Sequence, residues 1–361
     1  MAKSKRLVTI AGARPQFIKA FALSRALAAA DDFEEILVHT GQHFDDNMSN
    51  VFFEELGLRQ PKYHFAAAPS AQFAPLARMI TSIEEALETE RPDAVLVYGD
   101  TDSTLAGALA ATKKNIPLVH VEAGMRSFDR RMPEETNRIV ADHLSEMLLC
   151  VTPTAVENLS REGIVRNVHL VGDLMYDATL LAAAVAERRS NVLDRLQLKG
   201  KQYGVATVHR AANTDEPEML ARVLNFIAAE AEQQPIVFPM HPRTARAAAS
   251  AGLDVNRPGV KVVEPLGYLG MSKLLHHAKI VLTDSGGLQK EAYFHRVPCV
   301  TLRDETEWVE TIDSGWNRLW TEPEYRERQN IPVYGEGNAA AAIIERLREW
   351  QPPPRKYQAT S

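Results

Sequence analysis

Cysteine is nearly absent from this sequence, since only Cys150 and Cys299 occur among 361 residues, each inside an apolar stretch. Two such residues predict buried free thiols in a reducing compartment, not a disulfide framework. No apolar run approaches the roughly 20 residues that a membrane-spanning helix needs. The apolar stretch LVTIAGA after the basic start MAKSKR is short and meets Arg14-Pro15, which predicts a first strand and not a signal peptide. These absences predict a cytoplasmic protein with no membrane partner.

An excess of positive charge is also missing, because the formal net charge is −6. A chain with this balance lacks the general electrostatic footprint of a nucleic-acid-binding protein, so any anion site must be a local cluster of basic groups. No G-x-G-x-x-G follows a strand-like run, and no G-x-x-x-x-G-K-[ST], H-E-x-x-H or C-x-x-C occurs. The sequence therefore predicts neither a nicotinamide cofactor nor a P-loop, and no metal site.

Short β-rich runs alternate with longer helical patterns along almost the whole chain, which is the pattern of parallel sheets covered by helices. The length is sufficient for about two domains with sizeable cores. The predicted strands are Leu7–Ala11, Glu35–His39, Ala94–Tyr98, Pro117–Val121, Glu146–Val151, Val168–Val171, Gly204–Thr207, Pro235–Pro239, Val260–Val263, Lys279–Thr283 and Cys299–Leu302. The predicted helices include Phe17–Ala29, Ser103–Lys114, Glu134–Ser145, Pro217–Glu232 and Leu288–Phe294.

The alternation breaks around residues 172–203, where a long helical stretch gives way to the polar segment QLKGKQYG. The prediction is an α/β protein of two doubly wound domains around a cleft, with the first domain at 1–171 and the second at 172–338. Residues 339–361, which hold a last helix and a proline-rich tail, are expected to pack back on the first domain.

In open parallel sheets, ligands bind beyond the carboxyl ends of the strands. In the first half, these positions carry Arg14 and Lys19, then Asp100, then Glu122. A carboxylate directly after an apolar strand must find a partner or carry a shifted pKa, which makes Glu122 a candidate functional residue. Asp100 and Glu134 each start a helix, where an acidic residue can also serve only as a cap or a dipole complement.

In the second half, the strand ends carry His209 and His241, followed later by the stretch D-S-G-G that begins at residue 284. Glycines let backbone N–H groups approach an anion, and a helix N-terminus adds a favourable dipole. The alternatives are core histidines and a tight turn. From the residues alone, the prediction is a nucleotide diphosphate held by the second domain with its other end facing acids of the first.

Nine stretches then carry a resemblance to a known family. They are, in chain order, GARPQFIK (12–19), VYGDTDST (97–104), HVEAGMRSF (120–128), MPEETNR (132–138), VGD (171–173), TVHR (207–210), PMHPRT (239–244), DSGGLQKE (284–291) and RDETE (303–307). With these, the chain resembles the non-hydrolysing UDP-N-acetylglucosamine 2-epimerases over nearly its whole length.

The resemblance implies a glycosyltransferase-B-like fold of two Rossmann-type domains, an isomerase activity without a cofactor, and a homodimer that supplies cell-surface polysaccharide synthesis. It implies inversion at C2 of a UDP-sugar by elimination of UDP to a 2-acetamidoglucal and re-addition. The catalytic residues implied are Asp100, Glu122, Glu134 and His209. The substrate-binding residues implied are Arg14, Lys19, Arg138, His241, Ser285, Gly286 and Glu291.

The chain departs from the commonest family pattern at Gln16, Ala212 and Trp308. Several departures resemble the branch that acts on UDP-2,3-diacetamido-2,3-dideoxyglucuronate, so this sugar is an alternative substrate. Arg126, Arg130 and Arg131 are candidate partners for its C6 carboxylate. A UDP-sugar-dependent glycosyltransferase of the same fold and a hydrolysing epimerase are further alternatives, as is a catalytically inactive nucleotide-sugar-binding protein.

Overall fold

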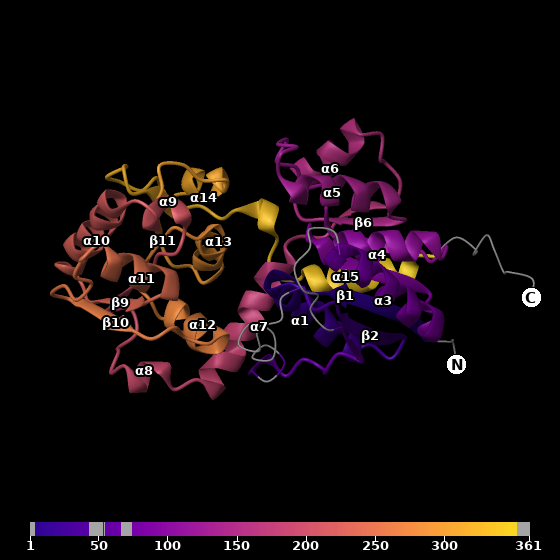
Figure 1. The fold of residues 1–361 in the computed structure, drawn as a ribbon, viewed down its shortest axis with the longest axis horizontal. Coiled ribbons are helices and arrows are strands. Elements are labelled where there is room, and N and C mark those ends of the chain that lie inside the picture. The colour runs from indigo at the N-terminus through magenta and orange to yellow at the C-terminus, as the bar shows by residue number, and fades with distance from the viewer. Residues whose placement is uncertain (1–3, 43–52, 54, 66–73, 352–361) are drawn as a thin grey trace, which may run out of the picture. The chain divides into compact units, whose positions relative to one another are not determined.

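A computed structural model gives the fold, and it describes residues 4–42, 53, 55–65 and 74–351. The chain divides into two compact units (Figure 1). The first unit consists of Met1–Ala178 with Pro332–Ser361, and the second of Thr179–Ile331. One change of unit lies within helix α7 (Leu174–Arg189), and the other lies directly before the 3-10 helix η1 (Pro332–Tyr334).

The first unit holds a seven-stranded sheet in the order β3-β2-β1-β4-β5-β6-β7, and each neighbouring pair is parallel. Its strands are β1 (Lys5–Ala11), β2 (Phe33–His39), β3 (Tyr63–His64), β4 (Ala94–Tyr98), β5 (Leu118–Ala123), β6 (Met147–Cys150) and β7 (Val168–Leu170). The strand order reverses between β1 and β4, which is the switch point where doubly wound sheets bind ligands.

Helices connect these strands in the first unit, as a parallel sheet requires. They are α1 (Arg14–Ala28), α3 (Ala74–Glu90), α4 (Asp102–Lys113), α5 (Pro133–Leu144) and α6 (Pro153–Arg161). The C-terminal helix α15 (Ala339–Glu349) also belongs to this unit. Lys5 Nζ donates to the carbonyls of Leu347 and Trp350, each at 2.7 Å, and so fastens the end of α15 to the start of β1.

The second unit repeats the pattern with a six-stranded parallel sheet in the order β10-β9-β8-β11-β12-β13. Its strands are β8 (Gly204–Thr207), β9 (Ile236–Pro239), β10 (Val260–Val263), β11 (Ile280–Thr283), β12 (Cys299–Thr301) and β13 (Asn317–Leu319). Its helices are α8 (Val192–Arg195), α9 (Ala211–Thr214), α10 (Pro217–Ala231), α11 (Pro242–Ser250), α12 (Tyr268–His276), α13 (Gly286–Phe294) and α14 (Val309–Asp313).

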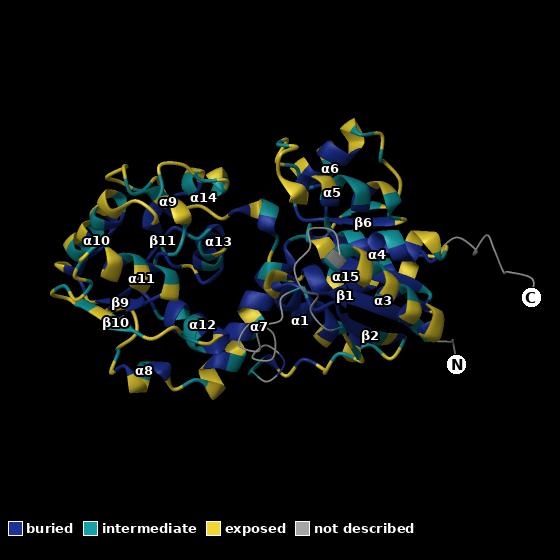
Figure 2. Ribbon diagram, in the orientation of Figure 1, coloured by how far each residue is buried: buried dark blue, intermediate teal, exposed yellow. Residues whose placement is uncertain are grey.

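Alternate residues of the second sheet pack into two cores, one on each face. Val205, Val281 and Cys299 belong to one buried cluster, whereas the next residues along the same strands, Ala206 and Leu282, belong to the other. Burial on both faces explains why these strands are apolar throughout. The two predicted free cysteines are buried and unpaired. Figure 2 shows the same pattern, with buried strands and exposure concentrated on the outer sides of helices.

The predicted α/β architecture of two Rossmann-type parallel sheets is confirmed. The sequence prediction missed β3 and β13, because β3 has two residues and β13 reads Asn-Arg-Leu without an apolar run. Pro117, Glu146, Pro235 and Lys279 were wrongly included in predicted strands, each of which begins one residue later. Of the described helices, none is long and apolar enough to cross a membrane.

Candidate active site

The first unit places four predicted site residues at the carboxyl ends of β1, β4 and β5. Arg14 is the exposed first residue of α1, and Lys19 lies buried one turn further along that helix. Asp100 follows β4, and Glu122 lies near the end of β5. Because β1, β4 and β5 are successive neighbours in the sheet, their carboxyl ends meet at one edge.

Glu122 sits in an irregular part of β5. The register with β6 shifts between Val121 and Ala123, and Glu122 itself has a φ of 70°. A bulge re-aims a side chain, and a left-handed conformation in a non-glycine residue must be stabilised by its surroundings. The Glu122 carboxylate forms an ion pair with the ammonium group of Lys19. A Cβ atom at Gly99 would lie 3.1 Å from Glu122 Oε2, so the glycine before Asp100 leaves room for this pair.

A buried hydrogen-bond network stabilises the β5 bulge at Glu122. His120, the second residue before Glu122, has Nε2 at 2.7 Å from the Gly99 carbonyl oxygen and Nδ1 at 2.7 Å from Asp142 Oδ1. Asp142 also accepts a hydrogen bond from the Gly124 backbone N–H at 3.1 Å. Burial acts to raise the pKa of Asp142, but His120 and Arg126 outweigh it, and the pKa lies below its ordinary value. The network thus fixes the backbone on both sides of Glu122.

Asp100 has its own cationic partner, since Arg138 on α5 pairs with its carboxylate. Arg138 Nη1 also lies 3.1 Å from Glu135 Oε2. Asn137 Nδ2 donates to the Asp100 carbonyl at 2.9 Å, which fastens the loop after β4 to α5. Predicted residue Glu134 is the second residue of the same helix, and its side chain is exposed with no hydrogen bond or ion pair to the described residues.

Two of the three arginines of the loop 126–131 pair with acidic residues. The Arg126 side chain is buried and donates to Glu162 at 2.7 Å and to Asp142 at 2.7 Å, so two acids of the first unit already pair with it. Its two acids already neutralise it. Arg130 and Arg131 are both exposed, and Arg131 pairs with Asp129 at 2.8 Å.

In the second unit, a fully buried carboxylate organises the switch point between β8 and β11. Asp284 accepts hydrogen bonds from the backbone N–H groups of His209 (3.0 Å) and Arg210 (2.9 Å), and from Asn213 Nδ2 (3.1 Å). Its Oδ1 lies 3.3 Å from His209 Nδ1. Burial acts to raise the pKa of Asp284, yet these donors hold it below its ordinary value. Asp284 therefore orients the His209 ring.

The remaining predicted residues of the second unit lie at the same edge of its sheet. Ser285 is the N-cap of α13, with its Oγ accepting from Leu288 N at 3.4 Å, and Gly286 opens that helix. The rings of His209 and His241 have centroids 5.6 Å apart. Burial and the neighbouring His209 lower the pKa of His241. Glu291 is half-buried on α13.

Sequence reasoning missed four buried residues that hold the two edges in place. These are Gln16, His120, Asp142 and Asp284. Gln16 Oε1 accepts from the Gly12 backbone N–H at 2.8 Å, while its Nε2 donates to the Tyr98 carbonyl at 2.8 Å, so it joins β1 to β4. Three of the four lie within or beside the quoted motifs. A buried polar residue next to a strand end is the signal that could have identified them.

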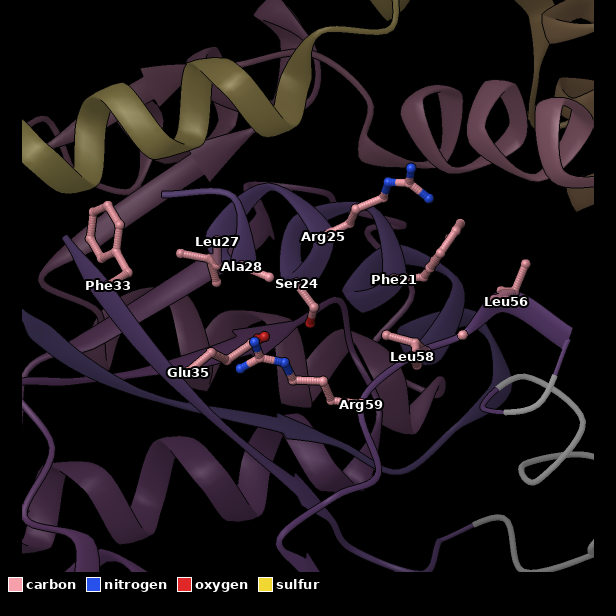
Figure 3. Close-up of a pocket in the computed structure, with 11 residues that line it drawn as sticks. Phe21, Ser24, Arg25, Leu27, Ala28, Phe33, Glu35, Leu56, Leu58 and Arg59 are labelled. Carbon is pink, nitrogen blue, oxygen red and sulfur yellow. The ribbon is translucent and has the colours of Figure 1, made fainter. Parts of the chain in front are cut away.

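A cavity of about 220 Å³ in the first unit lies apart from these side chains, between α1, β2 and residues 56–59. Figure 3 shows apolar walls with the Glu35 carboxylate beside the Arg59 guanidinium, and no predicted site residue lines it. In the second unit, Glu187, His276 and His277 lie close enough to hold one cation, with ligand atoms within 4.8 Å of one another. His277 Nε2 already lies 2.6 Å from Glu187 Oε1, so hydrogen bonding accounts for this cluster.

Comparison with known proteins decides the family. The family model described as UDP-N-acetylglucosamine 2-epimerase matches residues 25–348. The chain belongs to the UDP-N-acetylglucosamine 2-epimerase family. It is accordingly an isomerase of the non-hydrolysing type.

Relatives within the family carry more than one name. A UDP-N-acetylglucosamine 2-epimerase homolog of Methanococcus maripaludis is 46% identical over 95% of this chain and 99% of its own length. A UDP-2,3-diacetamido-2,3-dideoxy-D-glucuronate 2-epimerase of Pseudomonas aeruginosa is 46% identical over 87% of this chain and 88% of its own. The crystal structure of the Methanocaldococcus jannaschii UDP-GlcNAc 2-epimerase in complex with UDP-GlcNAc and UDP matches with a TM-score of 0.80 at 38% identity, covering 96% of this chain and 100% of that one.

Proposed function

We propose that this epimerase interconverts UDP-N-acetylglucosamine and UDP-N-acetylmannosamine. The observation that carries the proposal is the Glu122 carboxylate, held at a strained bulge against Lys19 beside the Asp100–Arg138 pair. Two carboxylates, each with a cationic partner, supply the groups that proton transfer at a sugar carbon needs.

The reaction proceeds by elimination and re-addition. A carboxylate of the first unit takes the C2 proton, the C2–H electron pair forms a C1–C2 double bond, and the C1–O bond breaks with its electrons passing to the β-phosphate oxygen. The product is 2-acetamidoglucal with UDP. In the reverse addition, C2 receives a proton on the opposite face and the UDP oxygen attacks C1. Asp100, Glu122 and Glu134 are the candidate acids and bases.

The departing diphosphate needs donors that are already in position. In this proposal they come from the second unit, from His209 held by Asp284 and from the backbone of Ser285 and Gly286 at the start of α13. A helix N-terminus with small residues is a suitable anion site. Arg14, Lys19, Arg138, His241 and Glu291 are the further proposed ligand-binding residues.

The alternative substrate is UDP-2,3-diacetamido-2,3-dideoxyglucuronate, which the Pseudomonas relative favours. Such a sugar needs a cation for its C6 carboxylate. Arg126 is engaged by Asp142 and Glu162, and Arg131 by Asp129, so two of the three candidate arginines already have acidic partners. We therefore rank UDP-N-acetylglucosamine first.

The test is proton NMR of the enzyme with each UDP-sugar in D2O. The proposal expects deuterium at C2 and accumulation of the manno epimer from UDP-N-acetylglucosamine, with the UDP linkage intact at equilibrium. Turnover of the diacetamido-glucuronate alone would select the alternative substrate. Release of free N-acetylmannosamine would indicate a hydrolysing enzyme, and the absence of exchange with both sugars would refute the proposal.

The same assay tests the three acids. Asp100→Asn, Glu122→Gln and Glu134→Gln remove one acid each with little change of shape. If none of the three lowers exchange at C2, the assignment of the acids to the first unit is wrong.

A further inference from the structure

The second unit has a cavity of about 610 Å³ at the amino-terminal edge of its sheet. Lys279 precedes β11 directly, and Arg296 lies a few residues before β12. Asp284 and Ser285 follow the other end of β11. A strand advances about 3.3 Å per residue, so the length of β11 separates this cavity from the predicted diphosphate edge. The cavity is a second, distinct feature of the same unit.

Basic side chains dominate the charge of this cavity. The charged residues that line it are Lys201, Lys279, Arg296, Arg318, Arg328 and Glu230. Five cations therefore face one carboxylate, in a chain whose formal net charge is −6. Like charges gathered in a concave surface repel one another and raise the local concentration of anions.

Aromatic rings hold three of these arginines in place. The guanidinium of Arg296 lies 4.4 Å from the Tyr293 ring centroid, and that of Arg328 lies 5.3 Å from the Trp316 ring. Arg318 lies 5.3 Å from the Tyr325 ring. Stacking on a ring already restricts the rotamers of each arginine. The arginines therefore lose less conformational entropy when a ligand binds, and the cationic groups are partly preorganised.

Two polar groups of the cavity lining lack a hydrogen-bond partner within the described part of the chain. They are Arg318 Nε and the Tyr325 hydroxyl, and both are buried. Arg318 uses its other nitrogens, with Nη1 donating to the Glu322 carbonyl at 2.5 Å and Nη2 lying 3.4 Å from Glu230 Oε1. A buried donor without an acceptor is destabilising, and an acceptor oxygen from a ligand would relieve that cost.

We propose that this cavity binds a small phosphate-rich anion, such as a polyphosphate chain or the phosphate tail of a nucleotide. The volume lies within the roughly 300–1,000 Å³ typical of small-molecule sites. Phosphate oxygens match both the planar guanidinium groups and the point charges of the lysines. The site is separate from the epimerase residues, and its occupancy does not require the proposed reaction.

The proposal is tested by isothermal titration calorimetry of the full-length protein with inorganic tripolyphosphate. The protein is first saturated with UDP, so that the predicted diphosphate-binding residues of the second unit are already occupied. The expected result is one tripolyphosphate per chain, with an affinity that falls as salt rises because the exposed charges are screened. The variant Lys279→Glu/Arg328→Glu changes two exposed lining residues outside the predicted active site. It is expected to weaken binding at least tenfold.

The matched control is Arg166→Glu/Arg195→Glu, which alters net charge equally at two exposed positions outside the cavity lining. This pair should bind tripolyphosphate as the wild type does. Equal weakening in both pairs would mean a nonspecific charge effect and would overturn the proposal. Loss of binding on saturation with UDP would do the same, as would the absence of binding in the wild type. Inorganic phosphate and ATP, titrated in parallel, show whether a single phosphate is sufficient or a nucleotide is preferred.

Discussion

The carboxylate of Glu122 and the ammonium group of Lys19 meet in the first unit, although 103 positions separate them in the sequence. Lys19 is buried, and Glu122 occupies the left-handed bulge of β5. Lys19 comes from the helix that follows β1, and Glu122 from the strand two places along the sheet. The pairing couples the position of a proposed acid–base residue to the first helix of the fold.

Glu122→Gln is expected to lower the rate of C2 proton exchange by about 10²–10⁴-fold, the usual contribution of general acid–base catalysis. Binding of UDP, measured by calorimetry, should change little, because the diphosphate contacts are predicted to lie in the second unit. Glu146→Gln, at an exposed site just before β6, is the control and should keep full turnover. A Glu122→Gln enzyme with wild-type exchange would remove Glu122 from the mechanism.

Asp142→Asn is expected to destabilise the protein by about 3–5 kcal/mol, because it leaves Arg126 buried with one of its two acids neutralised. Urea unfolding measures the change. Glu162→Gln removes the other, more exposed partner and should cost less. The double variant Asp142→Asn/Arg126→Met should recover part of the loss, and a loss in the double variant that equals the sum of the singles would contradict this explanation.

The same carboxylate gives a pH dependence whose sign follows from its pKa. The folded pKa of Asp142 lies below the unfolded one, so its stabilisation is present above the unfolded value of about 3.9 and is lost as pH falls through the folded pKa. Unfolding measured between pH 7 and pH 3 should therefore show a smaller loss of stability in Asp142→Asn than in the wild type. Parallel curves for the two proteins would assign the acid sensitivity to other groups.

Glu35→Gln is expected to stabilise the protein at neutral pH. Burial raises the pKa of Glu35, beside the cavity of Figure 3, while Thr9 Oγ1 donates to its Oε1 at 2.6 Å, a bond that glutamine can also accept. A raised folded pKa contributes stability fully below the unfolded value of about 4.3, and this is lost as pH rises through the folded pKa. The gain from Glu35→Gln should thus be larger at pH 8 than at pH 5, as measured by urea unfolding. Glu34→Gln, at an exposed ion pair with Arg6, should show no gain at either pH.

Gly286→Ala is expected to weaken UDP binding about tenfold or more, a change of about 1.4 kcal/mol. A Cβ atom at Gly286 would lie 2.2 Å from Glu307 Oε1, so the carboxylate must move, and the methyl group would also obstruct backbone access at the helix start. The neighbouring Gly287 is the control, because its Cβ would meet nothing closer than 4.0 Å. Equal affinity of the two alanine variants in calorimetry would refute a role of the Gly286 backbone.

The alternation of strands and helices, and the positions at which polar residues follow strands, could be predicted from the sequence alone. Strand periodicity and helix starts are local properties, so they can be recognised within each short segment of the sequence. Asp100, Glu122, His209 and Ser285 could therefore be placed at strand ends in advance. The two-residue strand β3 and the polar strand β13 were missed because they form through pairing with a neighbour and not through their own composition.

Which charged residues are used in structural ion pairs depends on three-dimensional packing and could not be predicted from the sequence. Arg126 is neutralised in the fold by Asp142 and by Glu162, which lies 36 positions away in the sequence. The bulge at Glu122 arises from register with β6, and the basic cavity gathers residues spread between positions 201 and 328. The energy of a charged group depends on its burial and on its nearest partners, and sheet order and packing set both. The sequence alone shows neither the burial of a charged group nor its nearest partners. An arginine that looks suited to ligand binding in the sequence can therefore form structural ion pairs in the fold.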